Sequence, residues 1–262
     1  MLILLPPSEG KTPPPRGRPV DLTALARPDL RPHRIRALRE LSEVSRAPDA
    51  HQRLGVGDSL AQEVRRNLDL AGAPAAPAAQ VYTGVLYEAA GMAGLRGTAR
   101  RRANACVRIV SALWGVLSPA DRIPAYRLSM TAGLPGIGAL APYWSQALGP
   151  ALTDDDPGVV IDCRSGPYVP AWRPPRELDW LAVRVVAERD GVRTVVSHHA
   201  KHARGVLTRH LLTRAPAPPR SVRGVRRAAE ELVGSVLQEV TVLPGRGSGP
   251  DTLELVVPPA RS

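Results

Sequence analysis

Short apolar runs and helical stripes alternate along this chain, and the alternation limits the folds it can adopt. Met1-Leu2-Ile3-Leu4-Leu5 is a continuous apolar run stopped by two prolines, which predicts a buried first strand. Further strands are predicted at 107–113, 159–162, 181–187, 192–197, 240–243 and 252–257. Asp190-Gly191 separates two of them and is typical of a hairpin turn. Because strands and helices are mixed throughout, the sequence predicts one compact domain of mixed α/β (α+β) class over residues 1–262.

Apolar or capping residues at helical spacing predict the helices. Ile35, Leu38, Leu41 and Val44 form a helical stripe. Ser59 and Gln62 have the spacing of a capping box, which predicts a second helix over 59–70. Two more helices are predicted at 198–212 and 226–237. The segment from about 35 to 75 is expected to protrude as a helical subdomain.

Only two of the 35 basic residues are lysines, Lys11 and Lys201, and every other positive charge is arginine. Such a composition indicates a compositional bias in which arginine has replaced lysine wherever arginine can perform the same role. A lysine that remains is a candidate for chemistry that arginine cannot supply, because the pKa of lysine shifts readily on burial. The alternative is that both lysines survived by chance.

The net charge of +11 and the pI near 10.8 favour a polyanionic partner. Scattered arginines raise the pI without any such partner, so charge alone does not decide this. No run of eighteen apolar residues predicts a membrane span, and the first apolar run is too short for a signal peptide. Cys106 and Cys163 are isolated, which favours a reduced, cytoplasmic protein.

The segment Ser8-Glu9-Gly10-Lys11-Thr12, directly after the first strand, is a candidate anion site. Its backbone N–H groups, the hydroxyls of Ser8 and Thr12, and the Lys11 ammonium could face a phosphate. The spacing of a Walker A loop is missing. The alternative is a tight turn with a solvated lysine.

A second candidate is the long segment from Ser111 to Met130, which follows a predicted strand and is broken by glycine and prolines. Ligands often bind at the carboxyl ends of strands in α/β sheets. Asp121, Tyr126 and Arg127 would supply an acceptor, a hydroxyl and an anion clamp. In the alternative interpretation the loop is structural, Asp121 caps a turn and Arg127 pairs with it.

The predicted helix at 198–212 places Lys201, Arg204 and Thr208 on one face. The lysine and arginine could form an anion site, and the alternative is a solvated basic face. His198 and His202 have the spacing of metal ligands, but no carboxylate or cysteine lies at a matching offset. The sequence therefore predicts no metal site and no cofactor, and Cys163 is expected to be a buried structural thiol.

Residues from about 35 to 71 fit a helix-hairpin-helix pattern. In it the hairpin residues Gly55, Val56, Gly57 and Ser59 would offer backbone N–H groups to a DNA phosphate. A similar pattern at Leu134-Pro135-Gly136-Ile137-Gly138 is interpreted as an ordinary turn.

Together these segments resemble the bacterial YaaA family of peroxide-stress proteins. The matching elements, in chain order, are Pro6 to Thr12, Tyr82-Thr83-Gly84, Ser111 to Met130, Asp162 to Tyr168, and Ala200 to Gly205. Both lysines fall on matching positions. Three residues depart from the family pattern: Trp114 replaces Tyr, Ser118 replaces Arg, and Ser129 replaces Glu.

The resemblance implies a compact mixed α/β body with a basic cleft, a helix-hairpin-helix element and DNA binding. It also implies a role in limiting iron-dependent oxidative damage to DNA, and it adds Thr83 to the candidate ligand-binding residues. The first functional hypothesis is therefore a stress protein that binds double-stranded DNA non-specifically.

The second hypothesis is an enzyme acting on a nucleotide, nucleobase or other phosphate-bearing small molecule. Its pocket would contain Lys11, Tyr126 and Lys201 as catalytic residues, with Arg127 and Arg204 as the anion clamp. The two hypotheses differ in whether Lys11 and Lys201 share one pocket. Direct iron binding finds little support, because the histidines near residue 200 lack a matching carboxylate.

Overall fold

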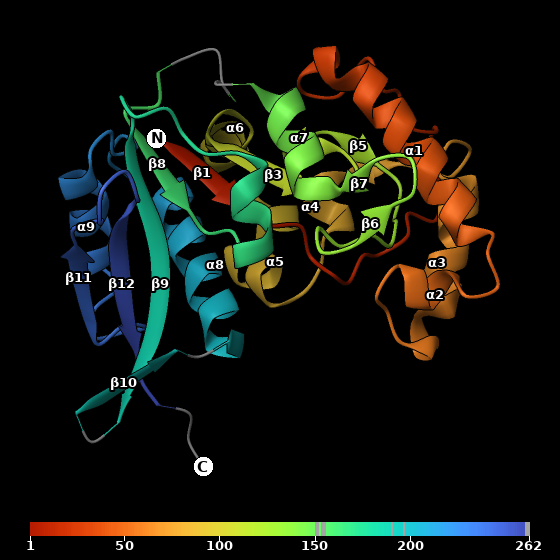
Figure 1. Cartoon of the computed structure of the whole chain (residues 1–262). Helices are drawn as coiled ribbons and strands as arrows, with labels where there is room; N and C mark the ends of the chain where they lie inside the picture. Colours follow the sequence, from red (N-terminus) through yellow and green to blue (C-terminus); the bar gives the residue numbers. More distant parts are fainter. Residues whose placement is uncertain (150–151, 153–155, 190, 196, 260–262) are drawn as a thin grey trace.

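Within the described residues of the computed structural model, eight strands form a mixed sheet that runs from β11 at one end of the molecule to β3 in its middle (Figure 1). The structure describes residues 1–149, 152, 156–189, 191–195 and 197–259. The strand order is β11-β12-β9-β8-β1-β3-β4, and β10 pairs with β9. The bounds are β1 Leu2–Leu5, β3 Val107–Ser111, β4 Gly115–Leu117, β8 Val159–Asp162, β9 Asp179–Arg189, β10 Val192–Val195, β11 Glu239–Leu243 and β12 Asp251–Val257.

Strand β1 lies inside the sheet, between the parallel strands β3 and β8. All four of its residues are buried, as a continuous apolar run predicts for a strand covered on both faces. Leu4 is in register with Arg108 on one side and Asp162 on the other. The predicted first strand and the strands at 159–162, 240–243 and 252–257 are confirmed, and the last two pair antiparallel.

Two predicted elements have different bounds from those expected. The strand predicted at 107–113 ends at Ser111, because its side-chain oxygen accepts a hydrogen bond from the Trp114 amide at 3.1 Å and the chain turns back into β4. The helix predicted at 226–237 is α9, Val222–Glu230. Its N-cap is Ser221, whose hydroxyl accepts from the Gly224 amide at 3.2 Å.

The predicted hairpin is confirmed by antiparallel pairing of β9 with β10, while its turn residue Asp190 lies outside the described residues. The turn predicted near Gly136 is also confirmed, because it joins the short antiparallel strands β6 (Gly133–Leu134) and β7 (Gly138–Ala139). The predicted helix at 198–212 is confirmed as α8, Ser197–Thr213.

The remaining elements are eight helices, five 3-10 segments and four two-residue strands within the described residues, of which α1 and α8 are the longest. The helices are α1 Arg31–Ser45, α2 Ala50–Arg53, α3 Ala61–Arg65, α4 Ala78–Val81, α5 Val85–Ala90, α6 Gly97–Cys106, α7 Leu140–Leu148 and α8 Ser197–Thr213. Single 3-10 segments are Pro28–Leu30, Asp58–Leu60, Arg66–Asp69, Met92–Gly94 and Gly166–Ala171. Two-residue strands are β2 Ala76–Pro77, β5 Arg122–Ile123, β6 Gly133–Leu134 and β7 Gly138–Ala139. Over the part of the chain that is described, no helix combines the length and apolarity needed to span a bilayer.

The helical segment α1–α3 lies at the end of the molecule opposite β11 and β12 (Figure 1). Arg34 of α1 is fully buried and donates to the carbonyl oxygens of Trp114 and Val116, both at 3.0 Å. The same guanidinium also donates to the carbonyls of Ala26 and Arg27. One buried side chain therefore joins α1 to the edge of the sheet at β4, although burial lowers its pKa to about 10.

The predicted second helix is divided into three short pieces, the 3-10 helix Asp58–Leu60, α3 and the 3-10 helix Arg66–Asp69. The predicted capping box is wrong, since no side chain caps the start of Asp58–Leu60 or of α3.

Candidate functional site

The loop after β1 is held in one conformation by the segment that contains Tyr82 and Thr83. Lys11 and Tyr82 form an isolated antiparallel bridge, and the Thr12 amide donates to the Val81 carbonyl at 2.9 Å. The Ser8 hydroxyl accepts from the Thr83 amide at 3.0 Å and donates to the Gly10 carbonyl. Ser8, Thr12 and Thr83 therefore fix the loop that presents Lys11.

Lys11 is half-buried, and its ammonium group contacts backbone oxygens and aromatic rings. Its side-chain nitrogen donates to the carbonyl oxygens of Ser8 at 2.8 Å and Glu9 at 3.2 Å. The same nitrogen lies 4.4 Å from the ring centroid of Tyr126 and 5.6 Å from that of Tyr82. Among the described residues, no carboxylate forms a salt bridge with it. The alternative of a solvated lysine in a turn does not describe this environment.

The pKa of Lys11 is lowered to about 7. Burial is the largest cause, since it disfavours the charged form, and the positive charge of Arg127 adds to the shift. Glu63 and Glu9 oppose the shift. The two aromatic faces also favour the ammonium form. Near neutral pH Lys11 can therefore exist as a free amine, which is able to accept a proton or attack an electrophile.

Two tyrosine rings lie against this lysine, those of Tyr82 and Tyr126, and the Tyr87 ring packs on Tyr82 with a centroid distance of 5.4 Å. The Tyr126 hydroxyl is 2.9 Å from that of Tyr82 and 2.7 Å from that of Ser111, which forms a buried hydroxyl chain. Burial raises the pKa of both Tyr82 and Tyr126, so the two phenols keep their protons. They can donate hydrogen bonds but do not supply a phenolate at neutral pH.

Arg127 is positioned next to Lys11 by residues of the helical segment. Its backbone N–H donates to the side-chain oxygen of Asn67 at 2.8 Å, and its carbonyl accepts from the Asn67 amide at 2.9 Å. Its guanidinium is 3.3 Å from both Glu63 and the carbonyl oxygen of Glu9. Asn67 and Glu63 were missed by the sequence analysis, although they lie four residues apart on one helical side and their residue types suit a polar contact.

Asp121 holds the loop rather than facing the Lys11 cluster. Its carboxylate accepts from the backbone amides of Ala26 and Ser118, both at 3.0 Å, and burial raises its pKa. In the alternative interpretation of this loop, the part in which Asp121 caps a turn is confirmed, while its pairing of Asp121 with Arg127 is wrong because Arg127 contacts Glu63. A ligand-binding role for Asp121 stays a prediction that these contacts do not favour.

On α8, Arg204 and Thr208 are bound to other protein groups. The Arg204 guanidinium donates to the Val183 carbonyl at 2.8 and 3.2 Å, and buried Thr208 donates to the Arg204 carbonyl at 2.8 Å. Lys201 is exposed, and no described contact joins it to the Lys11 cluster. A pocket shared by the two lysines stays a prediction.

Helix α8 packs closely on α5 (Figure 1). A side chain at Gly205 would lie 2.7 Å from the Cβ of Ala89, so only glycine allows this approach. Beside α8, burial raises the pKa of the Cys163 thiol to about 12, which fits the structural role expected of it. His198 has no described side chain, and no described residues form a cluster suited to a metal.

The segment between α2 and α3 contains the candidate hairpin residues, and a helix-hairpin-helix element stays a prediction. Gly55 has a φ of +65°, a conformation that favours glycine, and the Val56 amide donates to the His51 carbonyl at 2.9 Å. His51 also pairs with Asp58 at 2.8 Å. The backbone N–H groups of Gly57, Asp58 and Ser59 have no hydrogen-bond partner within the described part of the chain.

The fold and the Lys11 cluster together define a mixed α/β protein with a polar site at the carboxyl end of a central parallel strand. Comparison with known proteins then gives the family. The model of the family described as peroxide stress protein YaaA matches residues 1–230, and this chain belongs to that family.

Its relatives share most of their length with it. A UPF0246 protein of Streptomyces coelicolor is 37% identical over 260 residues, covering 98% of each chain. A UPF0246 protein of Corynebacterium efficiens is 40% identical over 216 residues, covering 81% of this chain and 85% of the relative. One from Corynebacterium glutamicum strain ATCC 13032 is 39% identical, covering 80% and 84%. The family description supports a role in peroxide stress.

Proposed function

We propose that this peroxide-stress protein binds double-stranded DNA without sequence preference and thereby limits iron-dependent oxidative damage to DNA. The observation that carries the proposal is a pair of exposed arginines beside the hairpin, Arg65 and Arg66. Neither side chain has a hydrogen-bond or ion-pair partner among the described residues. On the same helical segment, Arg46 and Arg53 are paired with carboxylates at 3.0 and 2.8 Å. Arg65 and Arg66 are therefore available to phosphates.

The hairpin supports the same proposal through its backbone. The N–H groups of Gly57, Asp58 and Ser59 can donate to a phosphate oxygen. The exposed Asp58 carboxylate opposes this, but its partner His51 offsets the charge when protonated. The net charge of +11 adds a long-range attraction to any duplex. No base-reading element is needed for binding of this kind.

The test is fluorescence anisotropy of a short labelled duplex across a salt series. We expect steep salt dependence for the wild type. Each lost phosphate contact should reduce the slope of log K against log salt by about 0.9, so R65E combined with R66E should reduce it by about 2. R101E is the matched control, since Arg101 is exposed on α6 and its side chain contacts only Thr98 among the described residues. R101E reverses one charge and R65E/R66E reverses two, so a weakening by R101E that is half that of the double variant would reduce the proposal to non-local charge.

Protection of DNA is tested separately. Plasmid nicking by ferrous iron and peroxide should fall when wild-type protein is added and should return towards the unprotected level with the R65E/R66E protein. Full protection by a variant that no longer binds DNA would show that the protein limits damage by a route other than DNA binding.

A second candidate function is favoured by one observation, the lowered pKa of Lys11. In this reading the cluster acts on a phosphate-bearing small molecule. Arg127 holds the phosphate. Lys11 acts as base or nucleophile, and Tyr126 donates a hydrogen bond from the buried hydroxyl chain.

This candidate function is simple to test because the chain contains only two lysines. Reductive methylation followed by peptide mapping reports Lys11 and Lys201 separately. A nucleotide or sugar phosphate that binds at the cluster should protect Lys11, leave exposed Lys201 unprotected, and lose its effect in R127Q. If no compound of a nucleotide and sugar-phosphate panel protects Lys11, this candidate fails.

A further inference from the structure

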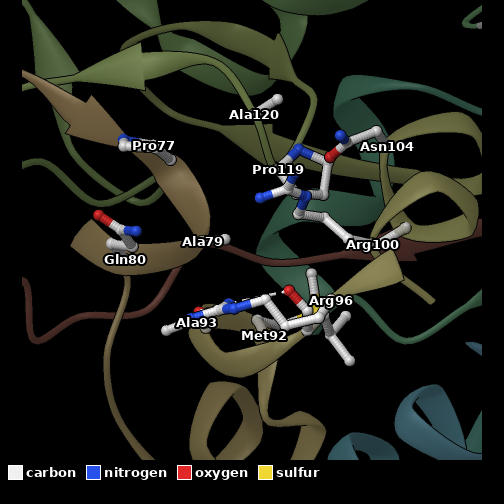
Figure 2. A pocket seen from close by; sticks show the side chains of 12 residues that line it. Pro77, Ala79, Gln80, Met92, Ala93, Arg96, Arg100, Asn104, Pro119 and Ala120 are labelled. Carbon is white, nitrogen blue, oxygen red and sulfur yellow. Dashed lines mark hydrogen bonds between the residues drawn. The ribbon is translucent and has the colours of Figure 1, made fainter. Parts of the chain in front are cut away.

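A cleft lies beside α6, and of the candidate segments named from the sequence only the one from Ser111 to Met130 reaches it, through Pro119 and Ala120 (Figure 2). Its volume is about 320 Å³. Small-molecule sites typically hold about 300–1,000 Å³, so this cleft suits a ligand no larger than a single nucleotide. Its walls come from α4, the 3-10 helix Met92–Gly94, α6 and the loop after β4.

The floor of the cleft is apolar. Met92, Leu95 and Ala103 are buried, and Pro77 and Pro119 add two further apolar side chains to the lining (Figure 2). A flat ring placed on such a floor loses water contacts on one face and gains packing in return. The floor by itself therefore favours a ligand with an aromatic or heterocyclic part.

Two arginines line the cleft, and Figure 2 shows Arg96 running towards Ala93 and Arg100 towards Pro119. Arg96 caps α6, and its carbonyl accepts the first helical hydrogen bond from the Arg100 amide at 3.3 Å. The Arg96 backbone is extended, with φ −133° and ψ 167°, so this side chain leaves the chain just before the first helical turn, whereas Arg100 lies within α6. No acidic residue belongs to the lining. The rim is accordingly an electropositive edge above an apolar floor.

The two arginines differ in a way that suits binding. Arg96 is already held, since its guanidinium donates to the carbonyl oxygens of Ala93 at 3.1 Å and Leu95 at 2.9 Å. Those contacts leave the remaining N–H groups of Arg96 free for an anion. The Arg100 side chain has no partner within the described residues and is exposed. One donor is thus preorganised and the other is available to close on the ligand.

Two amides complete the site. Asn104 follows Arg100 by one helical turn, and Gln80 lines the cleft from α4 on the other side (Figure 2). Neither side-chain amide has a hydrogen-bond partner within the described residues. Each amide offers both a donor and an acceptor, which is the pattern that the edge of a nucleobase requires.

We propose that this cleft binds a mononucleotide, with its phosphate between Arg96 and Arg100 and its base on the apolar floor. The charge supplies affinity for the phosphate ester, and the floor and the two amides supply the affinity for the base. The size of the cleft excludes a dinucleotide bound entirely within it. The site is separate from the Lys11 cluster and from the hairpin, so it stands or falls independently of the proposed DNA binding.

The experiment is isothermal titration of the full-length protein with adenosine 5′-monophosphate in phosphate-free buffer. We expect saturable binding to one site. R100Q should weaken it about tenfold or more, because a charge-assisted hydrogen bond contributes about 1.5–3 kcal/mol. R101Q is the matched control: the same helix loses the same charge at a residue outside the lining, so its affinity should stay within about twofold of wild type. Adenosine without phosphate should bind at least as weakly as the nucleotide binds to R100Q.

Several results would overturn the proposal. Absence of saturable nucleotide binding to the wild type is one, and equal weakening by R100Q and R101Q is another. A third is an R100Q protein that binds duplex DNA more weakly than R101Q but binds the nucleotide normally, because the cleft would then hold backbone phosphate. Thermal melts of all three proteins check that the variants are folded, which the exposure of both arginines leads us to expect.

Discussion

The side-chain nitrogen of Lys11 lies 4.4 Å from the ring centroid of Tyr126, without a salt-bridge partner among the described residues. Two opposing effects act on its proton. Burial and Arg127 favour the neutral amine, whereas the aromatic ring and Glu63 favour the ammonium. The environment of Lys11 therefore disfavours its charged form, and strongly shifted pKa values of this kind are typical of functional sites.

Replacing this lysine should stabilise the fold. The pKa of Lys11 is lowered from 10.5 to about 7, so between these values the unfolded chain binds more protons than the folded one. The free energy of unfolding of the wild type therefore rises as pH rises from about 7 to 10.5. Below pH 7 both states are protonated, and the wild type carries the full cost of burying the charge. We expect K11M to unfold at higher temperature than wild type, by about 2–4 °C for each kcal/mol gained.

The difference in unfolding temperature between K11M and the wild type should be largest at or below pH 7 and should shrink towards pH 10. Melting both proteins from pH 6 to pH 10 measures it. K201M is the control, because Lys201 is exposed. A difference between K11M and wild type that does not change with pH would argue against a lowered pKa.

The order of strands and helices could be predicted from the sequence because it depends on local patterns. A five-residue apolar run before two prolines predicts a buried central strand, and the buried strand β1 confirms this prediction. Element ends depend on single contacts that pattern does not show. The Ser111 hydroxyl ends β3 by accepting from the Trp114 amide, and no apolar pattern distinguishes residue 111 from residue 113.

The candidate site was predictable only in part, for a related reason. Lysine scarcity singled out Lys11, and the long loop singled out Tyr126 and Arg127, and the structure brings these three together. Asn67 and Glu63 come from a helical segment about 60 residues away in sequence. Their contacts with Arg127 depend on how that segment docks, which sequence spacing does not reveal. The contacts of Arg204 with Val183 are also set by packing rather than by helical spacing.

Arg34 should be among the least tolerant positions. Its guanidinium satisfies the carbonyls of Ala26, Arg27, Trp114 and Val116 in a fully buried setting. R34M leaves these acceptors without donors, so we expect a loss of about 3–5 kcal/mol. Urea unfolding measures the loss, and hydrogen exchange should show α1 losing protection first. R31M is the control, because Arg31 is on the same helix but exposed. Equal losses of unfolding free energy in R34M and R31M would show that Arg34 does not anchor α1.

Tyr126 should contribute stability through its hydroxyl as well as its ring. Y126F keeps the ring under Lys11 but removes the shared partner of Tyr82 and Ser111. Because the site is fully buried, we expect a loss of about 1–2 kcal/mol in urea unfolding. Y143F is the comparison, since the Tyr143 hydroxyl donates to the His33 carbonyl at 2.9 Å from a half-buried position. A smaller loss for Y126F than for Y143F would mean that the hydroxyl chain is not tightly formed.

The charges around Lys11 should shift its pKa in opposite directions when they are removed one at a time. Arg127 lowers this pKa, so R127Q should raise it, and the effect should be enlarged because Glu63 then loses its ion-pair partner. Glu63 raises the pKa, so E63Q should lower it below the wild-type value of about 7. NMR titration of ¹³C-methylated protein follows Lys11 directly, and Lys201 supplies a reference signal that neither variant should move. Shifts of the same sign in both variants would show that the two substitutions act through loop rearrangement. Opposite shifts would establish that Glu63 and Arg127 act on Lys11 through their charges, and that the helical segment sets the reactivity of the site.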